Sequence, residues 1–320
     1  MLNASKIYQE LRSELDILDK DRLRYYNRVR PFQYLLWLVL WVIGPFLIIR
    51  YNLDALQDFL FPDEDMEPVL FAYAGAFFAS LVLFLIAHYS NIGKFKKLFT
   101  DKIAPRIIEG LGPDFKYTYE KGWTSEEVSQ SGLFGAFSSF QSQDLVTGTI
   151  DGSKVKFAEI TMYRTSKTSG SSSSNTSKLF DGVMFEGELN VAFPTAIWIV
   201  GPRHYETLEK RGKTELNIDH PELKKYRFYA DDGEIGEKVL QAFVLDKIAA
   251  LNKKLDKEKK ITFGHIGYRF EKNQIQVAVP TFDKFMEPRL SRSMHDVTFI
   301  EEQVVLLNSL CSLMKDLTLH

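Results

Sequence analysis

The sequence predicts an α+β protein in three parts: an N-terminal amphipathic helix over residues 1–30, a two-helix transmembrane hairpin over 31–93, and a cytoplasmic mixed domain over 94–320. Three observations predict this arrangement. Apolar residues near the start recur at helical spacing, two long runs then lack any charge, and β-rich runs and helical patterns follow in irregular order. Antiparallel hairpins predominate among these runs, which favours α+β over a parallel doubly wound sheet.

The first thirty residues carry an apolar stripe among charged residues. Its members are spaced three, four or seven positions apart: Ile7, Leu11, Leu15, Leu18 and Tyr25. This spacing predicts an amphipathic helix, although Arg22 falls on its apolar face. The stripe could pack on the downstream domain, pair with a partner helix or lie on lipid. We expect the first of these, because it needs no further component.

Two uncharged runs follow, Pro31 to Ile49 with nineteen residues and Pro68 to Gly93 with twenty-six. About 20 apolar helical residues cross the hydrocarbon layer of a bilayer, which is about 30 Å thick. Neither run has the polar stripe of a soluble surface helix. Two buried core helices are the alternative, and the length of the runs favours two membrane spans.

Basic residues indicate the orientation of the predicted hairpin. They cluster before the first run and after the second, whereas the chain between the runs, with the loop 51–67, offers only Arg50. Lys and Arg concentrate on the cytoplasmic side, so we expect both termini in the cytoplasm and the loop outside. The bilayer is thus an expected partner, and the predicted lipid-facing basic flank consists of Arg24, Arg28, Arg30, Lys94, Lys96 and Lys97.

Local motifs place the first elements of the mixed domain. "TSEE" at Thr124 has the spacing of a capping box and predicts a short helix. Asp151-Gly152 between two β-rich runs predicts a hairpin turn. The Ser-rich segment 165–177 contains almost nothing to bury, so it is expected to be a disordered loop.

The sequence of the second half of the domain predicts two long helices and a further hairpin. Strands are expected around "LFDGVMFEGELNVAF" and "TAIWIVG", and a helix is expected after the acidic turn at Asp231-Asp232. "IGYRFEKNQIQVAVP" predicts a hairpin that turns at Lys272-Asn273. The last helix has a wide apolar face from Val297 to Leu317, which indicates burial against a sheet.

The net charge and the motifs of the sequence argue against several classes of function. A formal charge of −2 makes nucleic acid an unfavoured partner. The six histidines form no metal-binding signature, and no phosphate loop, dinucleotide fingerprint or nucleophile elbow occurs. The single cysteine, Cys311, lies on an apolar helix face and is expected to be a buried small hydrophobe. We therefore assign no catalytic, cofactor-binding or metal-binding residue and expect no cofactor.

One stretch is a candidate protein-binding surface. "SGLFGAF" places Leu133, Phe134 and Phe137 together among small residues. An exposed apolar cluster of this kind would bind a partner or a second copy of the chain. Core packing is the alternative, and the sequence favours it.

The cytoplasmic blocks resemble a bacterial family of two-span membrane proteins with a domain of unknown function, often encoded near LemA-type proteins. The best matches are "SGLF" at Ser131, "FDG" at Phe180 with Phe185, and "FMEP" at Phe285. Where many relatives have Ala-Arg, this chain has Gly236-Glu237, so a role of that Arg does not transfer. The resemblance implies a bacterial inner-membrane location and supplies no catalytic residue.

These observations favour a non-enzymatic, multi-pass protein of the inner membrane. Its cytoplasmic domain would bind a protein partner or self-associate, as a binding or scaffold module. The alternative is an enzyme that acts on a membrane-associated substrate, with a site assembled from dispersed polar residues. A filled core with an exposed apolar patch would favour the first, and a pocket with converging polar groups the second.

Overall fold

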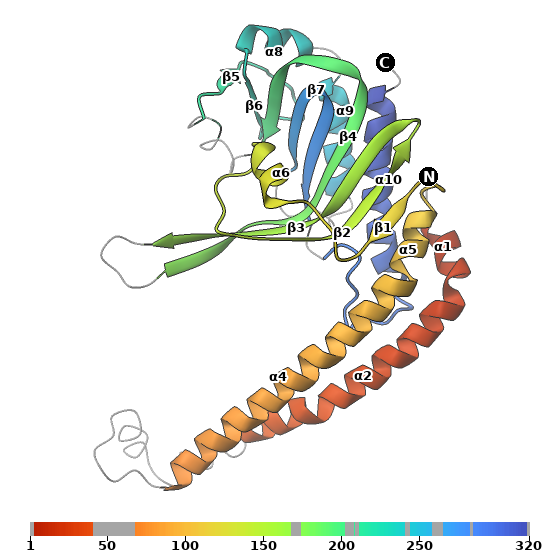
Figure 1. Ribbon diagram of the computed structural model, residues 1–320, viewed down its shortest axis with the longest axis vertical. Coiled ribbons are helices and arrows are strands. Elements are labelled where there is room, and N and C mark those ends of the chain that lie inside the picture. The colour runs from red at the N-terminus through yellow and green to blue at the C-terminus, as the bar shows by residue number, and fades with distance from the viewer. Residues whose placement is uncertain are drawn as a thin grey trace. The chain divides into compact units, whose positions relative to one another are not determined.

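An antiparallel sheet forms the centre of one part of the chain, and two long helices form the other (Figure 1). The computed structural model describes residues 3–40, 68–167, 174–201, 208, 211–240, 244–257, 265–281 and 284–318. The chain divides into two compact units: a helical unit of Arg12–Asp101 with Pro288–Asp296, and a mixed unit of Met1–Leu11, Lys102–Glu287 and Val297–His320. The protein is therefore mixed α+β, as the sequence predicts.

The helical unit is built mainly from α2 (Arg12–Leu38) and α4 (Pro68–Lys102), which run in opposite directions (Figure 1). Pro31 lies inside α2 rather than at its start, so one helix continues from the amphipathic segment into the first apolar run. Of that run, residues 31–40 are described and helical. Its remainder and the predicted outer loop 51–67 lie outside the described residues.

Membrane-spanning potential is found in one helical stretch of the described chain. By length and composition, Phe77–Glu109 is able to cross a membrane, and 11% of its most apolar window is buried. The 35 residues of α4 span about 52 Å at about 1.5 Å per residue, which exceeds the hydrocarbon thickness. The second span, the multi-pass topology and the cytoplasmic termini remain predictions.

The mixed unit contains the sheet and the shorter helices. Its helices are α1 (Ala4–Glu10), α5 (Ala104–Glu109), α6 (Ser125–Gln130), α8 (Gly233–Leu240), α9 (Val244–Lys257) and α10 (Val297–Thr318). Its strands are β1 (Lys116–Thr118), β2 (Ser139–Ile150), β3 (Ser153–Lys167), β4 (Ser174–Val200), β5 (Thr214–Leu216), β6 (Arg227–Ala230) and β7 (Gly267–Pro280). The strand order is β1-β2-β3-β4-β6-β5, and β7 pairs with β4.

Several local predictions are confirmed. The β2–β3 hairpin turns at Asp151 and Gly152, whose φ values of 49° and 86° are those of a turn in which both residues are left-handed. Thr124 and Glu127 form the capping box of α6. Asp232 accepts a hydrogen bond from the Ile235 amide at the start of α8. α1 packs against α10, so the first residues of the N-terminal segment dock as expected, whereas the segment from Arg12 on belongs to the helical unit.

Strand β7 folds back on itself at Lys272, whose φ is 51°, so the predicted hairpin is confirmed. Arg269 on one arm donates to Gln276 on the other. Both arms pair with β4: residues 182–188 face 274–280, and residues 197–199 face 268–270. The β7 hairpin is therefore nested between two arms of β4, whose chain curves over the β7 turn (Figure 1), and Phe193 is paired with Lys272 there.

The Ser-rich segment differs from the expected disordered loop 165–177. Residues 165–167 of β3 pair with 174–176 of β4, and Ser177 pairs with Arg164. The Thr165 and Thr176 hydroxyls lie 3.1 Å apart across the strands, and Ser138 donates to Thr165 Oγ1 at 3.0 Å. The expectation is wrong at both ends of the segment, because the hairpin ladder and cross-strand hydroxyl pairs order residues that have no core to enter. Residues 168–173 lie outside the description.

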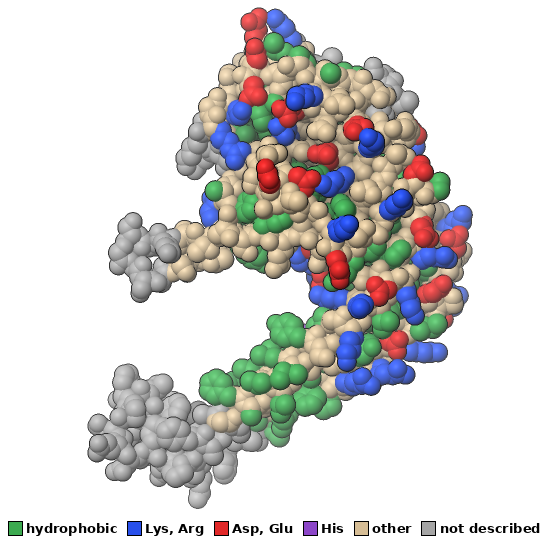
Figure 2. All heavy atoms as spheres, in the orientation of Figure 1, with side chains coloured by type: hydrophobic (Ala, Val, Ile, Leu, Met, Phe, Trp, Pro, Cys, Tyr) green, Lys and Arg blue, Asp and Glu red, His purple; other side chains and the backbone are tan. Residues whose placement is uncertain are grey.

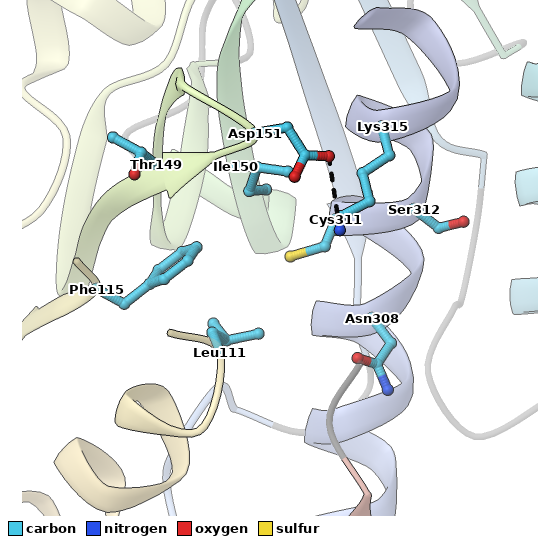
Figure 3. Close-up of a pocket in the computed structure, with 9 residues that line it drawn as sticks. All are labelled: Leu111, Phe115, Thr149, Ile150, Asp151, Asn308, Cys311, Ser312 and Lys315. Carbon is cyan, nitrogen blue, oxygen red and sulfur yellow. Dashed lines mark ion pairs between the residues drawn. The ribbon is translucent and has the colours of Figure 1, made fainter. Parts of the chain in front are cut away.

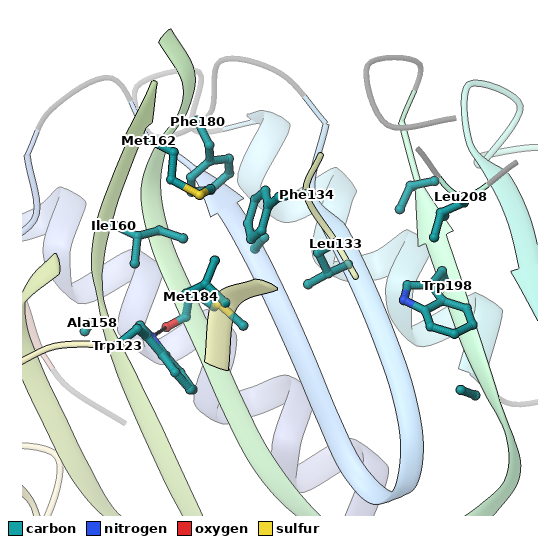
Figure 4. Packing of buried hydrophobic residues seen from close by; sticks show 14 of the residues in the cluster. Trp123, Leu133, Phe134, Ala158, Ile160, Met162, Phe180, Met184, Trp198 and Leu208 are labelled. Carbon is teal, nitrogen blue, oxygen red and sulfur yellow. Dashed lines mark hydrogen bonds between the residues drawn. The ribbon is translucent and has the colours of Figure 1, made fainter. Parts of the chain in front are cut away.

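Alternation along the strands separates two faces of the sheet. Ala158, Ile160 and Met162 of β3 join one apolar cluster with Trp123 of the segment before α6 and Trp198 of β4 (Figure 4). The intervening residues 157, 159 and 161 point to the opposite face, because side chains alternate along a strand. α10 packs on this second face: a Cβ at Gly187 would meet the Met314 sulfur at 2.4 Å.

A substitution at Gly182 tests how closely β4 and β7 pack at this pairing. A Cβ at this position would lie 2.1 Å from the Val279 carbonyl oxygen and 2.8 Å from Pro280 Cα, both in backbone that has little freedom to move. We expect Gly182→Ala to lower the free energy of unfolding by about 1–3 kcal/mol. Thermal unfolding of the full chain in detergent, followed by circular dichroism, measures the change.

The matched control is Gly93→Ala in α4, where nothing lies within 4 Å of the new Cβ. Alanine favours helix over glycine by about 1 kcal/mol, so this variant should unfold no earlier than the unaltered chain. Equal destabilisation by the two substitutions would contradict the packing explanation.

Candidate functional site

The helical unit exposes an unusual amount of apolar surface. Among the residues that the structure describes, sixteen large hydrophobic side chains are exposed, and fourteen of them lie between Ile17 and Tyr89. Eleven of these form what we call the apolar belt: Tyr34, Leu35, Trp37, Leu38, Leu40, Phe78, Val82, Leu83, Leu85, Ile86 and Tyr89. Figure 2 shows hydrophobic side chains gathered along this part of α2 and α4. Soluble monomers rarely expose a contiguous surface of this kind.

The predicted basic flank borders the belt on both helices. Arg24, Arg28 and Arg30 are exposed on α2, and on α4 Lys94 and Lys97 are exposed while Lys96 is half-buried. The Arg30 Nε atom donates to the Tyr34 hydroxyl at 2.6 Å, and its guanidinium lies 5.2 Å from the centre of that ring. This contact joins the last basic residue of the flank to the first aromatic residue of the belt.

The predicted partner surface lies mostly inside the mixed unit. Leu133 and Phe134 are 1% and 2% exposed in the cluster of Figure 4, and the Phe134 ring meets Phe180 edge to face at 4.9 Å. Phe137 is half-buried at the margin of the cluster. The Ser131 carbonyl accepts a hydrogen bond from Trp198 Nε1 at 3.1 Å, which secures this segment to β4. Leu133 and Phe134 thus contribute to the core in this conformation.

A group of charged residues, which sequence reasoning missed, lies on the second face of the sheet, and two of its members, Asp144 and Glu159, are almost fully buried. We call it the charge cluster: Asp144, Glu159, Asp181, Lys284 and Glu287. The Lys284 Nζ atom donates to Glu159 Oε1 at 2.5 Å, to Thr161 at 2.6 Å and to Asp181 at 3.1 Å. The Phe285 amide donates to the other Glu159 oxygen at 2.7 Å. Glu159 is 3% exposed, so the strand delivers a carboxylate into an interior where only these donors compensate its charge.

Asp144 enters the cluster through a break in the β2–β3 ladder. The register shifts between Gln143 and Val146, and Asp144 has a φ of 61°, which is rare for a residue other than glycine. Its side chain accepts a hydrogen bond from the Tyr117 hydroxyl. Asp144 is 1% exposed, and its charge interacts with those of Glu159 and Glu287. The bulge therefore turns a second carboxylate inward, toward the first.

Burial dominates the electrostatics of the two sealed carboxylates. It raises the pKa of Asp144 to about 7, assisted by Glu159 and Glu287. It also raises the pKa of Glu159 to about 7, although Lys284 works in the opposite direction. For the more exposed Asp181, burial is outweighed by hydrogen bonds from Lys178 and Lys284, so its pKa is lowered. Burial would lower the pKa of Lys284, but Glu159 and Asp181 raise it.

This arrangement is suited to holding a proton rather than a ligand. Side chains that are 1% and 3% exposed offer no surface to a substrate. Among the described residues, no group of three His, Cys, Asp or Glu side chains has the geometry of a metal site. Two carboxylates with pKa values near neutrality can exchange a proton with solvent as the pH changes. One sequence signal could have indicated the cluster: "FDG" contributes Asp181, and "FMEP" contributes Glu287 and the Phe285 amide that donates to Glu159.

A second buried ion pair lies in the helical unit. The Arg22 Nε atom donates to Asp19 Oδ1 at 2.8 Å, and Arg22 Nη1 donates to the Leu290 carbonyl at 2.9 Å. Asp19 Oδ1 also accepts from the Met294 amide at 2.8 Å and from the Ser293 hydroxyl at 3.1 Å. The residue that interrupts the apolar stripe of α2 therefore binds the segment Pro288–Asp296 to that helix.

Two cavities are lined by described residues of the mixed unit. One of about 150 Å³ lies between β2 and α10 and is lined partly by Cys311, Asn308 and Lys315, which pairs with Asp151 at 3.5 Å (Figure 3). Burial raises the pKa of the Cys311 thiol to about 11, so this thiol is a poor nucleophile. The other, which we call the crossover groove, measures about 510 Å³ and is lined by Leu189, Val191, Ala192, Phe193, Pro194, Val239, Val244 and Leu317.

Two ion pairs of equal spacing on α2 allow a matched test of burial. Asp19–Arg22 side chains are 12% and 10% exposed, whereas Asp21–Arg24 side chains are 26% and 67% exposed. Asp19→Ala leaves a buried guanidinium and a buried amide without their acceptor, so we expect a loss of about 3–5 kcal/mol in unfolding free energy. Asp21→Ala should cost less than about 1 kcal/mol.

The pH dependence of this stabilisation has a defined sign. Burial would raise the pKa of Asp19, but hydrogen bonds from Arg22 and Met294 outweigh it and the pKa is lowered. The contribution is therefore present above the ordinary aspartate pKa of about 3.9 and is lost as the pH falls below it. Thermal unfolding of both variants between neutral and acid pH checks this, and equal losses would contradict the role of burial.

Comparisons with known proteins identify one family. A domain of the family described as a protein of unknown function (DUF3137) is found at residues 178–319, from the first part of β4 to the end of α10. A search of curated proteins finds no match. Among solved structures, the mycobacterial trehalose monomycolate transport factor A, TtfA, is similar at 10% identity, over 71% of this chain and 96% of that chain. Its TM-score of 0.31 supports no conclusion about fold or function.

Proposed function

We propose that this protein is a multi-pass inner-membrane protein in which α2 and α4 continue into a two-helix transmembrane hairpin that holds the mixed unit in the cytoplasm. The observation that carries the proposal is the apolar belt, which is exposed on two antiparallel helices. Burial in lipid would remove this surface from water. Tyr34, Trp37 and Tyr89 suit the interfacial region, where amphipathic aromatic residues are enriched.

The basic flank supports the same placement. Its exposed members follow or precede the belt by a few residues on each helix, where lipid headgroups would lie. Each Lys or Arg near an anionic membrane surface contributes about 1 kcal/mol. The orientation rule for Lys and Arg then places the chain on both sides of residues 31–93 in the cytoplasm.

On this anchor the mixed unit would act as a binding module rather than an enzyme. The two carboxylates at the centre of the charge cluster, Asp144 and Glu159, are 1% and 3% exposed, which disfavours the enzymatic alternative. The crossover groove, in contrast, is apolar and about 510 Å³ in volume, within the range of ligand and side-chain pockets. Val191 at its edge is 46% exposed. We assign this groove to an apolar segment of a protein partner.

The membrane placement is tested by extraction and by labelling. We expect the full chain to stay with the membrane through an alkaline carbonate wash. In a Cys311→Ala background, a membrane-impermeant maleimide should label Glu64→Cys on intact cells and Ser172→Cys only after permeabilisation. A chain that is monodisperse without detergent would refute the anchor, and the reverse labelling pattern would refute the orientation.

The groove is tested with two matched surface substitutions. Val191 and Ile235 are the exposed large hydrophobic residues of the mixed unit in the described chain, at 46% and 37%. We expect Val191→Glu to remove the protein that co-purifies with the full chain from mild detergent, because the charge would have to enter an apolar pocket. Ile235→Glu, on α8 outside the groove lining, should retain it. An identical set of co-purifying proteins in both would contradict the assignment.

A further inference from the structure

The smaller cavity, between β2 and α10, shares no lining residue with the charge cluster or with the crossover groove, and we call it the turn cavity. Its volume of about 150 Å³ has room for about six to eight non-hydrogen atoms. Three parts of the mixed unit line it (Figure 3): Leu111 and Phe115 between α5 and β1, Thr149, Ile150 and Asp151 at the end of β2, and Asn308, Cys311, Ser312 and Lys315 of α10.

The inner end of the turn cavity is apolar. A Cβ at Gly148 of β2 would lie 2.6 Å from Phe115 Cδ1, so the glycine lets this ring pack against the strand and form one wall. Leu111 and Ile150 continue that wall, and the Cys311 sulfur points toward it from α10 (Figure 3). Burial raises the pKa of the Cys311 thiol to about 11, so the thiol stays neutral near pH 7. The inner end therefore suits an uncharged aliphatic group.

The mouth of the cavity, in contrast, carries one charge of each sign. Lys315 Nζ lies 3.5 Å from Asp151 Oδ2, and the two side chains are 48% and 52% exposed. An ammonium has three donors and a carboxylate accepts up to about four hydrogen bonds, so both groups can contact a ligand while they remain paired. The mouth can thus bind an anionic and a cationic group side by side.

The two ends together define the chemistry of a ligand. A molecule with a single charge would satisfy only one partner at the mouth, whereas a zwitterion satisfies both. An α-amino acid carries its ammonium and its carboxylate on one carbon, from which the side chain extends away from both. An aliphatic side chain of three or four carbons suits the volume and the apolar wall.

We propose that the turn cavity binds a small aliphatic α-amino acid of the size of valine or leucine. Its carboxylate accepts from Lys315, its ammonium donates to Asp151, and its side chain packs against Leu111, Phe115 and Ile150. A ligand in this position connects the β2–β3 turn to α10 and stabilises the mixed unit by mass action. This inference depends neither on the membrane placement nor on the partner assigned to the crossover groove.

Cys311, the single cysteine of the chain, reports whether the cavity is occupied. Methyl methanethiosulfonate modifies thiols, and the mass of the intact chain records the adduct. We expect L-leucine to slow this modification of the full chain in detergent in a saturable manner, about tenfold at a concentration about ten times its Kd. An unchanged rate with valine, leucine, isoleucine and methionine up to about 10 mM would overturn the proposal.

Analogues of leucine separate the parts of the recognition. Isocaproate lacks the ammonium, isoamylamine lacks the carboxylate, and glycine lacks the side chain. We expect each to need at least about tenfold more ligand than leucine for the same protection, because each loses one set of contacts. Protection by isocaproate or isoamylamine equal to that by leucine would overturn the assignment of a zwitterion. Equal protection by glycine would overturn the assignment of an aliphatic ligand.

Two substitutions at the mouth place the binding in this cavity. Asp151→Asn and Lys315→Gln each remove one charge at a half-exposed position, and asparagine before glycine suits the left-handed turn at residue 151. Each should raise the leucine concentration for half-maximal protection about tenfold. Lys315 also acts on the thiol, so protection is the ratio of the rates without and with leucine for each variant.

The matched control is Glu215→Gln. Glu215 of β5 pairs with Arg227 of β6 at 3.6 Å, with side chains 50% and 44% exposed, and neither residue lines the turn cavity. This variant should be protected by leucine as the unaltered chain is. Unaltered protection in both mouth variants, or an equal loss in the control, would overturn the proposal.

Discussion

The placement of charge in a sealed interior is the constraint on which the mixed unit depends. Glu159 occupies the middle of a strand whose neighbours enter the core, so its carboxylate must find donors that arrive from elsewhere in the chain. Lys284 and the Phe285 amide, 125 and 126 residues away, supply them. The same contacts fix the chain between β7 and α10 to the sheet at Lys284 and Phe285.

This constraint joins features that look unrelated along the chain. After the nested β7 hairpin, the chain reaches the second face of the sheet at Lys284 and Phe285. The bulge at Asp144 turns another carboxylate toward the same face. In the helical unit, Asp19 and Arg22 likewise form a buried ion pair, and Asp19 binds the segment Pro288–Asp296. In each unit, therefore, a buried carboxylate accepts hydrogen bonds from the chain between β7 and α10.

The apolar belt of the helical unit is governed by hydrophobicity and not by buried charge. Its side chains are exposed in this structure. Contact with lipid or with a protein partner would remove them from water. The basic flank, the interfacial aromatic residues and the length of α4 agree with lipid. The DUF3137 match covers residues 178–319 and leaves α2 and α4 outside, so only the chemistry of these two helices supports the proposed membrane anchor.

The sequence by itself determined features that depend on near neighbours. These are the α+β class, the turn at Asp151-Gly152, the capping box at Thr124 and the wide apolar face of α10, because each is set by residues a few positions apart. Only the tertiary structure decided the rest. It placed Leu133 and Phe134 in the core, extended strands into the Ser-rich segment, and gave Arg22 and Glu159 their partners. Such contacts join residues far apart in the chain, and the environment that shifts a pKa exists only after those residues have met.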